Sequence, residues 1–212
     1  MDKTIISENS GSIFLRDSWE RGELSNWDLV RGAGAYLQYK FGVLNMEAWT
    51  VEMLRGLNGQ LESELLEEGR SLFEKRMADK IYPEAARLVA QHLAEGHVVA
   101  IISGSIRFLV EPLAAFLSVK HVLCTELETK DGVLTGRCVE PICFEDGKIY
   151  WLQGFIERHQ IDLARSWFYT DSITDLPVLD LVGHPVATNP DPMLYLTANR
   201  RGWPIRFFDE PD

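Results

Sequence analysis

The sequence predicts an α/β fold, because two different patterns divide the chain. From about residue 12 to residue 82, apolar side chains recur at three- and four-residue spacing, which is typical of amphipathic helices. From residue 83 onward, helical patterns alternate with short β-branched runs. Strands that are separated by helices indicate a mostly parallel sheet with helices on both faces. The length of 212 residues suits one core domain with a smaller insert.

The first region predicts a helical bundle. Its periodicity indicates helices over 27–41, 46–57 and 61–81, separated where Gly42, Asn58 and Gly59 favour turns. We expect four large aromatic side chains inside this bundle: Trp19, Trp27, Trp49 and Phe73. As a domain assignment, residues 1–11 and 83–212 form the core, and residues 12–82 form an inserted helical-bundle cap.

The second region predicts the elements of a Rossmann-like sheet. Val98–Ser103 is a β-branched run typical of a buried strand, and Asp131-Gly132 predicts a hairpin between two polar strands. We expect Trp151 and Trp167 to pack in the core. Further strands are expected at His121–Thr125, Trp167–Thr170, Pro185–Thr188 and Ile205–Phe208, and helices at Glu84–Glu95, Phe108–Leu117, Lys148–His159, Pro177–Val182 and Pro192–Arg200.

Composition excludes several classes of partner. The formal net charge is -11, and a surface this acidic disfavours nucleic acid and anionic membranes, whose binding needs Lys and Arg. A small phosphorylated metabolite remains compatible, since it needs only one local basic pocket. The 3 cysteines form no regular framework, which indicates a reduced, cytoplasmic protein. No apolar run approaches the length of a membrane-spanning helix, so we expect no membrane insertion.

Two carboxylates follow one of the predicted strands. In a parallel sheet, ligands bind beyond the carboxyl ends of the strands. Asp171 ends the strand Trp167–Thr170, and Asp175 follows four residues later, so both would lie on one side of a helical turn. Paired carboxylate ligands at this edge suit Mg²⁺. The alternative is that Asp175 only caps the helix begun by Pro177.

A hydroxyl and a lysine stand at two other points where anions could bind. Ser103-Gly104 follows a buried strand, where a hydroxyl and free N–H groups could hold an anion. Lys148 opens a helix, where its charge opposes the helix dipole and a bound phosphate would justify it. The alternatives are a helix N-cap for Ser103 and a solvated surface position for Lys148.

In order along the chain, these residues resemble the four motifs of the haloacid dehalogenase superfamily. The matching segments are Met1-Asp2-Lys3-Thr4, Ser103-Gly104, Gly147-Lys148 and Asp171-Ser172-x-x-Asp175. The phosphoserine-phosphatase-like branch has its helical cap after the first motif, which is where residues 12–82 lie. The resemblance extends through Asn189-Pro190-Asp191-Pro192 and therefore covers nearly the whole chain.

This resemblance implies that the protein is a phosphatase that requires Mg²⁺. It also implies a role for each matched residue. Asp2 matches the acid that protonates the leaving group and then activates water, Lys148 neutralises charge, and Asp175 holds a metal-bound water or the lysine. The implied residues are Asp2 and Lys148 for catalysis; Thr4, Ser103, Gly104 and Lys148 for phosphate binding; and Asp2, Asp171 and Asp175 for the metal.

The nucleophile that the resemblance implies does not stand in this sequence. It would be an aspartate directly before Met1, preceded by an apolar strand, and it would form a phosphoaspartate. We expect a misplaced start, with the natural chain beginning upstream, because the remaining motifs are intact. One alternative is a truncated, non-catalytic module that binds phosphate compounds or a partner. Asp2-Lys3-Thr4 also resembles the phosphorylated motif of P-type ion pumps, in which Asp2 itself would be the nucleophile; the lack of membrane helices disfavours this.

The implied substrate is a small phosphomonoester, because a cap that closes over the site excludes bulky molecules. Phosphoserine, histidinol phosphate and a lipid-derived phosphate all lie within the range of the branch. Dehalogenase chemistry is disfavoured, since haloacid dehalogenases do not use the second aspartate that Asp2 matches. The 5 histidines are scattered, and we expect no metal site among them.

Overall fold

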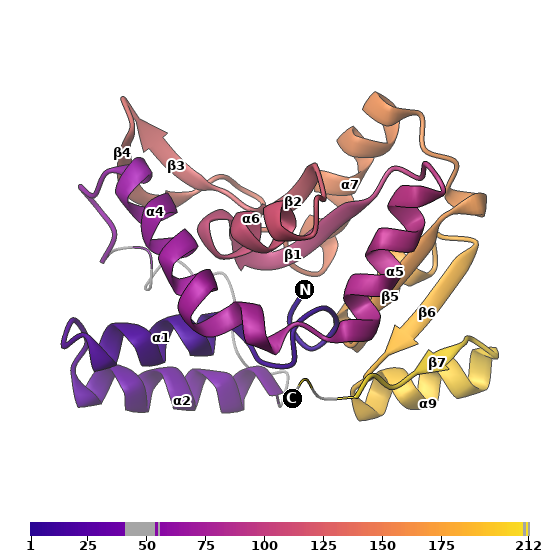
Figure 1. Ribbon diagram of the computed structural model, residues 1–212, viewed down its shortest axis with the longest axis horizontal. Helices are drawn as coiled ribbons and strands as arrows, with labels where there is room; N and C mark the ends of the chain where they lie inside the picture. Colours follow the sequence, from indigo (N-terminus) through magenta and orange to yellow (C-terminus); the bar gives the residue numbers. More distant parts are fainter. Residues whose placement is uncertain (41–53, 55, 210, 212) are drawn as a thin grey trace.

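The computed structural model describes residues 1–40, 54, 56–209 and 211 (Figure 1). The helical region and the strands β3 and β4 lie at one side of the view, β1 and β2 lie in the middle, and β5, β6 and β7 lie at the other side. The predicted α/β fold class, with parallel strands and a helical insert, is confirmed. None of the described helices combines the length and apolar character needed to cross a membrane.

The helical region agrees with its predicted periodicity where it is described. A π-helical turn at Phe73–Met77 and a 3-10 turn at Ala78–Lys80 continue its last α-helix. The predicted helix over 46–57 falls largely outside the described residues. The α-helices of this region are α1 (Ser10–Glu20), α2 (Asn26–Lys40) and α4 (Glu62–Leu72).

Two of the expected interior tryptophans were predicted wrongly. Trp19 is 41% exposed and Trp27 is 76% exposed, whereas Phe73 is buried. The Trp19 indole N–H donates to Asn26 Oδ1 at 2.9 Å, so its polar end is satisfied at the surface rather than in the core. Trp49 lies outside the described residues.

The remaining elements follow the predicted order closely. The strand after α5 is β1, which begins two residues later than predicted and continues past Ser103 through an irregularity, so that Ile106 pairs with Thr125. Helices are α5 (Pro83–Ala94), α6 (Arg107–Phe116), α7 (Asp146–His159), α8 (Leu176–Leu179) and α9 (Pro192–Arg201). Strands are β1 (Ala100–Ile106), β2 (His121–Thr125), β3 (Leu127–Lys130), β4 (Val133–Cys138), β5 (Trp167–Thr170), β6 (His184–Thr188) and β7 (Ile205–Arg206).

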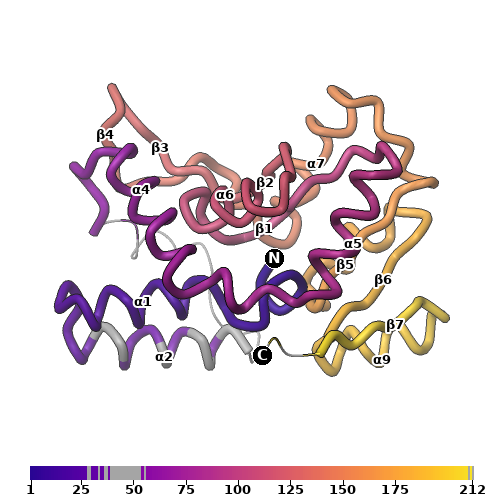
Figure 2. The backbone as a smooth tube through the Cα atoms, in the orientation of Figure 1, coloured from indigo at the N-terminus to yellow at the C-terminus, as the bar shows by residue number. Residues whose placement is uncertain are grey.

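The parallel strands form two separate pieces. β1 pairs with β2, and β5 pairs with β6, which pairs with β7, all in parallel. Helices α6 and α7 pack on the first piece, and α8 and α9 pack on the second. Between β1 and β5 lies a largely apolar cavity of about 420 Å³, whose lining includes Met1, Ile101 and Phe168. The backbone trace shows the N-terminus near the middle of the molecule (Figure 2).

The hairpin β3–β4 confirms the turn predicted at Asp131-Gly132. Both residues have positive φ, 53° and 77°, as a tight two-residue hairpin turn requires. The hairpin also pairs with the helical region, because Leu61 bridges Val133 and Gly59 N–H donates to Leu134 O at 2.9 Å.

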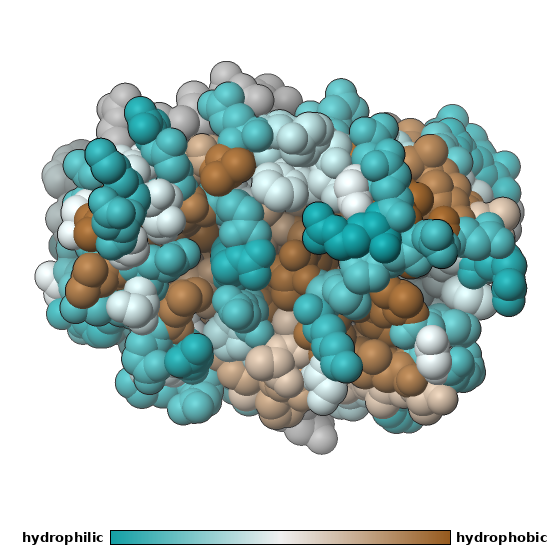
Figure 3. Space-filling view, turned by 90° about the horizontal axis from the view of Figure 1, so that it is seen from above, coloured by the Kyte–Doolittle hydropathy of each residue, from teal (hydrophilic) through white to brown (hydrophobic). Residues whose placement is uncertain are grey.

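One hydrophobic core joins the helical region to the sheet. Leu65 and Leu72 of α4 are buried in the same cluster as Phe108 and Leu113 of α6. The two helices approach closely at Gly69, where a Cβ atom would stand 2.0 Å from Phe108 O. Seen from above, the surface carries apolar side chains in separate patches among polar ones (Figure 3). The helical region therefore packs through α4 on α6, which in turn lies on β1 and β2.

Candidate active site

Asp2 is held in a fixed orientation by the start of α1. Its Oδ2 accepts hydrogen bonds from Asn9 Nδ2 at 3.0 Å and from Ser10 Oγ at 3.1 Å. Asn9 also caps α1, since its side chain accepts from Ser12 N–H. The other oxygen, Oδ1, is buried and has no hydrogen-bond partner. Burial raises the pKa of Asp2 from its ordinary value.

The amino group of Met1 lies among the charged residues of the site. Burial lowers the pKa of this amino group, and Asp2, Lys148, Asp171 and Asp175 all act on it electrostatically. Four of the predicted site residues are therefore gathered around the first residue of the chain.

Asp171 stands directly after β5 and faces the first motif. Thr4 Oγ1 donates to Asp171 Oδ1 at 2.9 Å. Burial is the main cause that raises the pKa of Asp171, to about 6. Asp191 supports this loop, because its own N–H donates to Asp171 O at 2.7 Å and its Oδ2 accepts from Ile173 N–H at 2.7 Å.

Lys148 and Asp175 form a buried ion pair. Lys148 Nζ lies 2.5 Å from Asp175 Oδ1, and Thr170 Oγ1 donates to Asp175 Oδ2 at 2.6 Å. Lys148 is not a solvated surface lysine, and Asp175 does not cap α8 with its side chain. Gly147 is required beside them, because a Cβ atom there would stand 1.9 Å from Ile142 O.

Ser103 lies at the same edge, at the end of the regular pairing of β1. Its hydroxyl is buried and accepts from Ser105 N–H at 3.2 Å. The N-cap of α6 is Ile106, so the alternative of Ser103 as a helix cap was wrong. Gly104 is exposed, and its carbonyl accepts from Thr125 Oγ1 at 2.9 Å.

The arrangement fits a hard divalent cation at two of the three predicted metal ligands. Asp2 has a buried oxygen without a partner, and burial of Asp171 disfavours its charge; a cation would compensate both. Asp175 differs, because Lys148 and Thr170 occupy both of its oxygens. Within the described residues, no three carboxylates come within 4.8 Å of one another.

Several supporting side chains were not found from the sequence. They are polar residues that hold the carboxylates: Asn9, Ser10, Ser105, Thr170 and Asp191. Asn9 carried a usable signal, since Asn before a helical pattern is a typical N-cap. Asp191 stood in a segment that matched the family but received no role. Ser10, Ser105 and Thr170 gave no signal, because their contacts depend on tertiary packing; Ser105 Oγ, for example, lies 2.9 Å from Ser10 Oγ.

The comparisons with known proteins agree with this geometry. The family model of haloacid dehalogenase-like hydrolases matches residues 1–180. The chain belongs to this family of hydrolases.

Two curated relatives and one solved structure are similar to this chain over nearly its whole length. A phosphoserine phosphatase of Mycobacterium tuberculosis is 32% identical, over 98% of this hydrolase and 69% of the relative. A histidinol-phosphatase of Neisseria meningitidis is 33% identical, over 98% of the hydrolase and 96% of the relative. A crystal structure of a Bordetella pertussis protein of unknown function superposes with a TM-score of 0.88 at 27% identity, covering 97% and 95% of the two chains. The predicted resemblance to the phosphoserine-phosphatase branch is confirmed. The prediction that the protein is an enzyme, a phosphatase of this family, is confirmed as well.

Proposed function

We propose that this hydrolase cleaves small phosphomonoesters with Mg²⁺ and passes through a phosphoaspartate. The observations that support it most strongly are three. Thr4 donates to Asp171, Lys148 pairs with Asp175, and Asp2 keeps a buried oxygen without a hydrogen-bond partner. The named activities of the relatives point to phosphoserine and histidinol phosphate as the first substrates to test. Both are small and carry an amino group beside the phosphorylated alcohol.

In this proposal the basic and hydroxyl groups hold the phosphoryl oxygens. Lys148 supplies the charge, Ser103 and Thr4 supply hydroxyl groups, and the Gly104 N–H lies beside Ser103 on the exposed edge. Asp175 acts on the substrate only through Lys148, whose ammonium group it fixes. Asp171 would hold Mg²⁺, which when bound neutralises phosphate charge. Asp2 would join it as a ligand only while ionised, because its one free oxygen cannot bind the metal and carry the catalytic proton together.

Asp2 would move protons in both chemical steps. A carboxylate attacks phosphorus, the bond from phosphorus to the ester oxygen breaks, and that oxygen takes the proton of Asp2. Asp2, now ionised, removes a proton from water as the water attacks the phosphoaspartate. Inorganic phosphate leaves, and the attacking carboxylate and the proton on Asp2 are both restored.

We propose that the attacking carboxylate comes from an aspartate joined to Met1. Any residue joined there enters the cluster of Asp2, Asp171 and Lys148, because the Met1 amino group is buried among them. The cavity between β1 and β5 supports a preceding strand, since it is apolar, is lined by both strands and reaches Met1. A strand in this cavity would satisfy the facing backbone groups of β1 and β5.

The test uses the protein isolated from its native host. Its intact mass is measured, and phosphate release from phosphoserine and histidinol phosphate is followed with Mg²⁺ and with a chelator. We expect a mass above 24.1 kDa, turnover of at least one substrate, and loss of turnover on chelation. A mass that matches this sequence, together with no turnover, would contradict the covalent mechanism and favour a phosphate-binding module. A longer folded chain that turns over no phosphomonoester would contradict the proposed function itself.

A further inference from the structure

A second cluster of ligand side chains lies at the C-terminal end of α5. His92, Glu95 and His97 each offer one ligand atom, and these atoms all lie within 4.8 Å of one another. His92 Nδ1 and His97 Nδ1 are 2.9 Å apart, and Glu95 Oε2 is 3.6 Å from His97 Nδ1. It is the one such group in the part of the chain that the structure describes. The expectation of no metal site among the histidines therefore needs revision.

The end of α5 brings the two histidines together by its backbone geometry. Gly96 has a φ of 77°, and its N–H donates to Leu93 O at 3.1 Å, while His97 N–H donates to His92 O at 3.0 Å. This pair of bonds defines a Schellman motif, which places the side chains at the positions of His92 and His97 in contact. The juxtaposition is thus fixed by a helix ending that requires glycine at residue 96.

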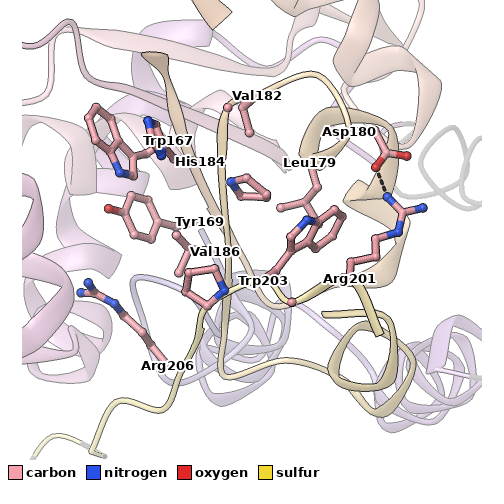
Figure 4. A pocket seen from close by; sticks show the side chains of 14 residues that line it. Trp167, Tyr169, Leu179, Asp180, Val182, His184, Val186, Arg201, Trp203 and Arg206 are labelled. Carbon is pink, nitrogen blue, oxygen red and sulfur yellow. Dashed lines mark hydrogen bonds and ion pairs between the residues drawn. The ribbon is translucent and has the colours of Figure 1, made fainter. Parts of the chain in front are cut away.

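The groups around His92 leave one of its ring nitrogens available to bind a metal ion. His92 Nε2 lies 3.0 Å from the hydroxyl of Tyr169, so this nitrogen can carry the proton and leave a lone pair on Nδ1. On the other side, the indole of Trp167 stacks on His97 and on His184, with interplanar angles of 27° and 16°. Tyr169, Trp167 and Arg206 lie along one side of the pocket in Figure 4.

We propose that His92, Glu95 and His97 bind one divalent transition-metal cation of the Zn²⁺ class. Two imidazole nitrogens and one carboxylate suit Zn²⁺, and a tetrahedral ion with bonds of about 2.0–2.1 Å separates its ligands by roughly 3.3 Å. The two separations that involve His97 Nδ1, 2.9 Å and 3.6 Å, need to change by only a few tenths of an ångström. The carboxylate of Glu95 and the negative end of the α5 dipole favour a cation here, whereas Arg206 and a protonated His97 both disfavour positive charge on His92.

This site differs from the candidate active site in chemistry and lies at the other end of β5. His92 and His97 line the same cavity that would receive the strand preceding Met1, so the ligand cluster would lie at one end of that cavity. The cluster stands where β1 and β5 begin, and Asp171 stands where β5 ends, about 13 Å along the strand by the rise of four residues. Nitrogen ligands prefer Zn²⁺ to Mg²⁺, whereas the carboxylates of Asp2 and Asp171 suit Mg²⁺. An excess of Mg²⁺ therefore leaves the new site open to Zn²⁺.

The experiment is a calorimetric titration of the full chain with Zn²⁺ in excess Mg²⁺ at neutral pH. We expect one Zn²⁺ per chain. His92→Asn and His97→Asn should each weaken binding at least tenfold, since even a change in a supporting residue costs about 10–100-fold. Glu95→Gln should also weaken it, and it changes an exposed side chain to one of nearly the same size.

Two matched variants locate the bound ion. His184→Asn removes a histidine that stacks on Trp167 but offers no ligand, so its Zn²⁺ affinity should remain that of the unchanged chain. Asp171→Asn changes the active-site edge and should also leave this affinity intact. No Zn²⁺ binding in excess Mg²⁺, or binding that survives His97→Asn and Glu95→Gln, would overturn the proposal. Binding lost only in Asp171→Asn would overturn it as well, because the ion would then lie at the active site.

Discussion

The two ends of β5 carry two different kinds of polar cluster. At the carboxyl end, the oxygen ligands of Asp2 and Asp171 are half-buried beside the buried ion pair of Lys148 and Asp175. At the amino end, His92 and His97 present nitrogen atoms, and the side chain of His97 is 38% exposed. The difference teaches that the burial of charge, rather than the number of ligands, separates a candidate catalytic edge from a candidate peripheral metal site. Each prediction below perturbs one end and leaves the other unchanged.

The largest effect is expected when Asp2 is changed to Asn. The amide keeps the shape of the side chain but cannot exchange protons with the leaving group or water. We expect the turnover number for the best phosphomonoester to fall by about 10²–10⁴-fold. Steady-state phosphate release measures this, and His97→Asn serves as the control that keeps its turnover. Equal losses in both variants would mean that the two ends of β5 are not independent.

The next largest effect is expected from Lys148→Met. This change leaves Asp175 buried without its cation, and breaking a buried pair in this way costs about 3–5 kcal/mol in the free energy of unfolding. Arg201→Met is the matched control, since its pair with Asp180 is exposed and worth less than about 1 kcal/mol.

Urea unfolding followed by circular dichroism measures both variants. The double variant Lys148→Met with Asp175→Asn should recover part of the loss, because the uncompensated charge is removed. A single Lys148→Met variant as stable as the unchanged chain would contradict the buried pair.

The candidate catalytic edge was largely predictable from the sequence, for a physical reason. Parallel strands end at one edge, so the residues that follow them, such as Ser103 and Asp171, could be placed together without coordinates. The family resemblance added a role to Asp2, which carries no signal alone, and made specific the role of Lys148, whose place at a helix start already suggested an anion site. The sequence could not predict which carboxylate oxygens lack a hydrogen-bond partner. The hydrogen bonds from Thr170 to Asp175 and from Ser10 to Asp2 depend on how the elements pack.

The fold shows the same division between pattern and packing. The boundaries of β2 and β5 match their predicted ranges, because β-branched and aromatic runs bounded by polar residues mark strands well. Trp27 and Trp167 were misplaced, because hydrophobicity alone does not say which face of an element is covered. The histidine cluster was missed, because a five-residue separation is not a helical spacing and only the turn at Gly96 closes it.

A smaller effect is expected from Gly147→Ala, which acts on the catalytic end alone. The added Cβ atom would stand 1.9 Å from Ile142 O, so the backbone before Lys148 must shift. We expect a loss of about 1–3 kcal/mol in the free energy of unfolding, with lower phosphatase turnover. Gly154→Ala in the same helix is the control: its Cβ meets nothing within 4 Å, and alanine should stabilise the helix by about 0.5–1 kcal/mol. Similar unfolding midpoints for the two variants would show that the close approach at Gly147 is relaxed in solution.

The smallest effect is expected from Gly96→Ala, which acts on the opposite end. A left-handed backbone costs about 1–2 kcal/mol for a residue with a Cβ atom, although the space beside Gly96 is open. Gly202→Ala imposes the same strain at the end of α9, away from the histidines. Both variants should lose similar stability, but only Gly96→Ala should weaken Zn²⁺ binding in the calorimetric titration, because only there does the turn position His97. Unchanged Zn²⁺ affinity in Gly96→Ala would show that the ligand side chains come together without the left-handed turn at the end of α5. The two ends of β5 would then differ in burial but not in the rigidity of their backbones.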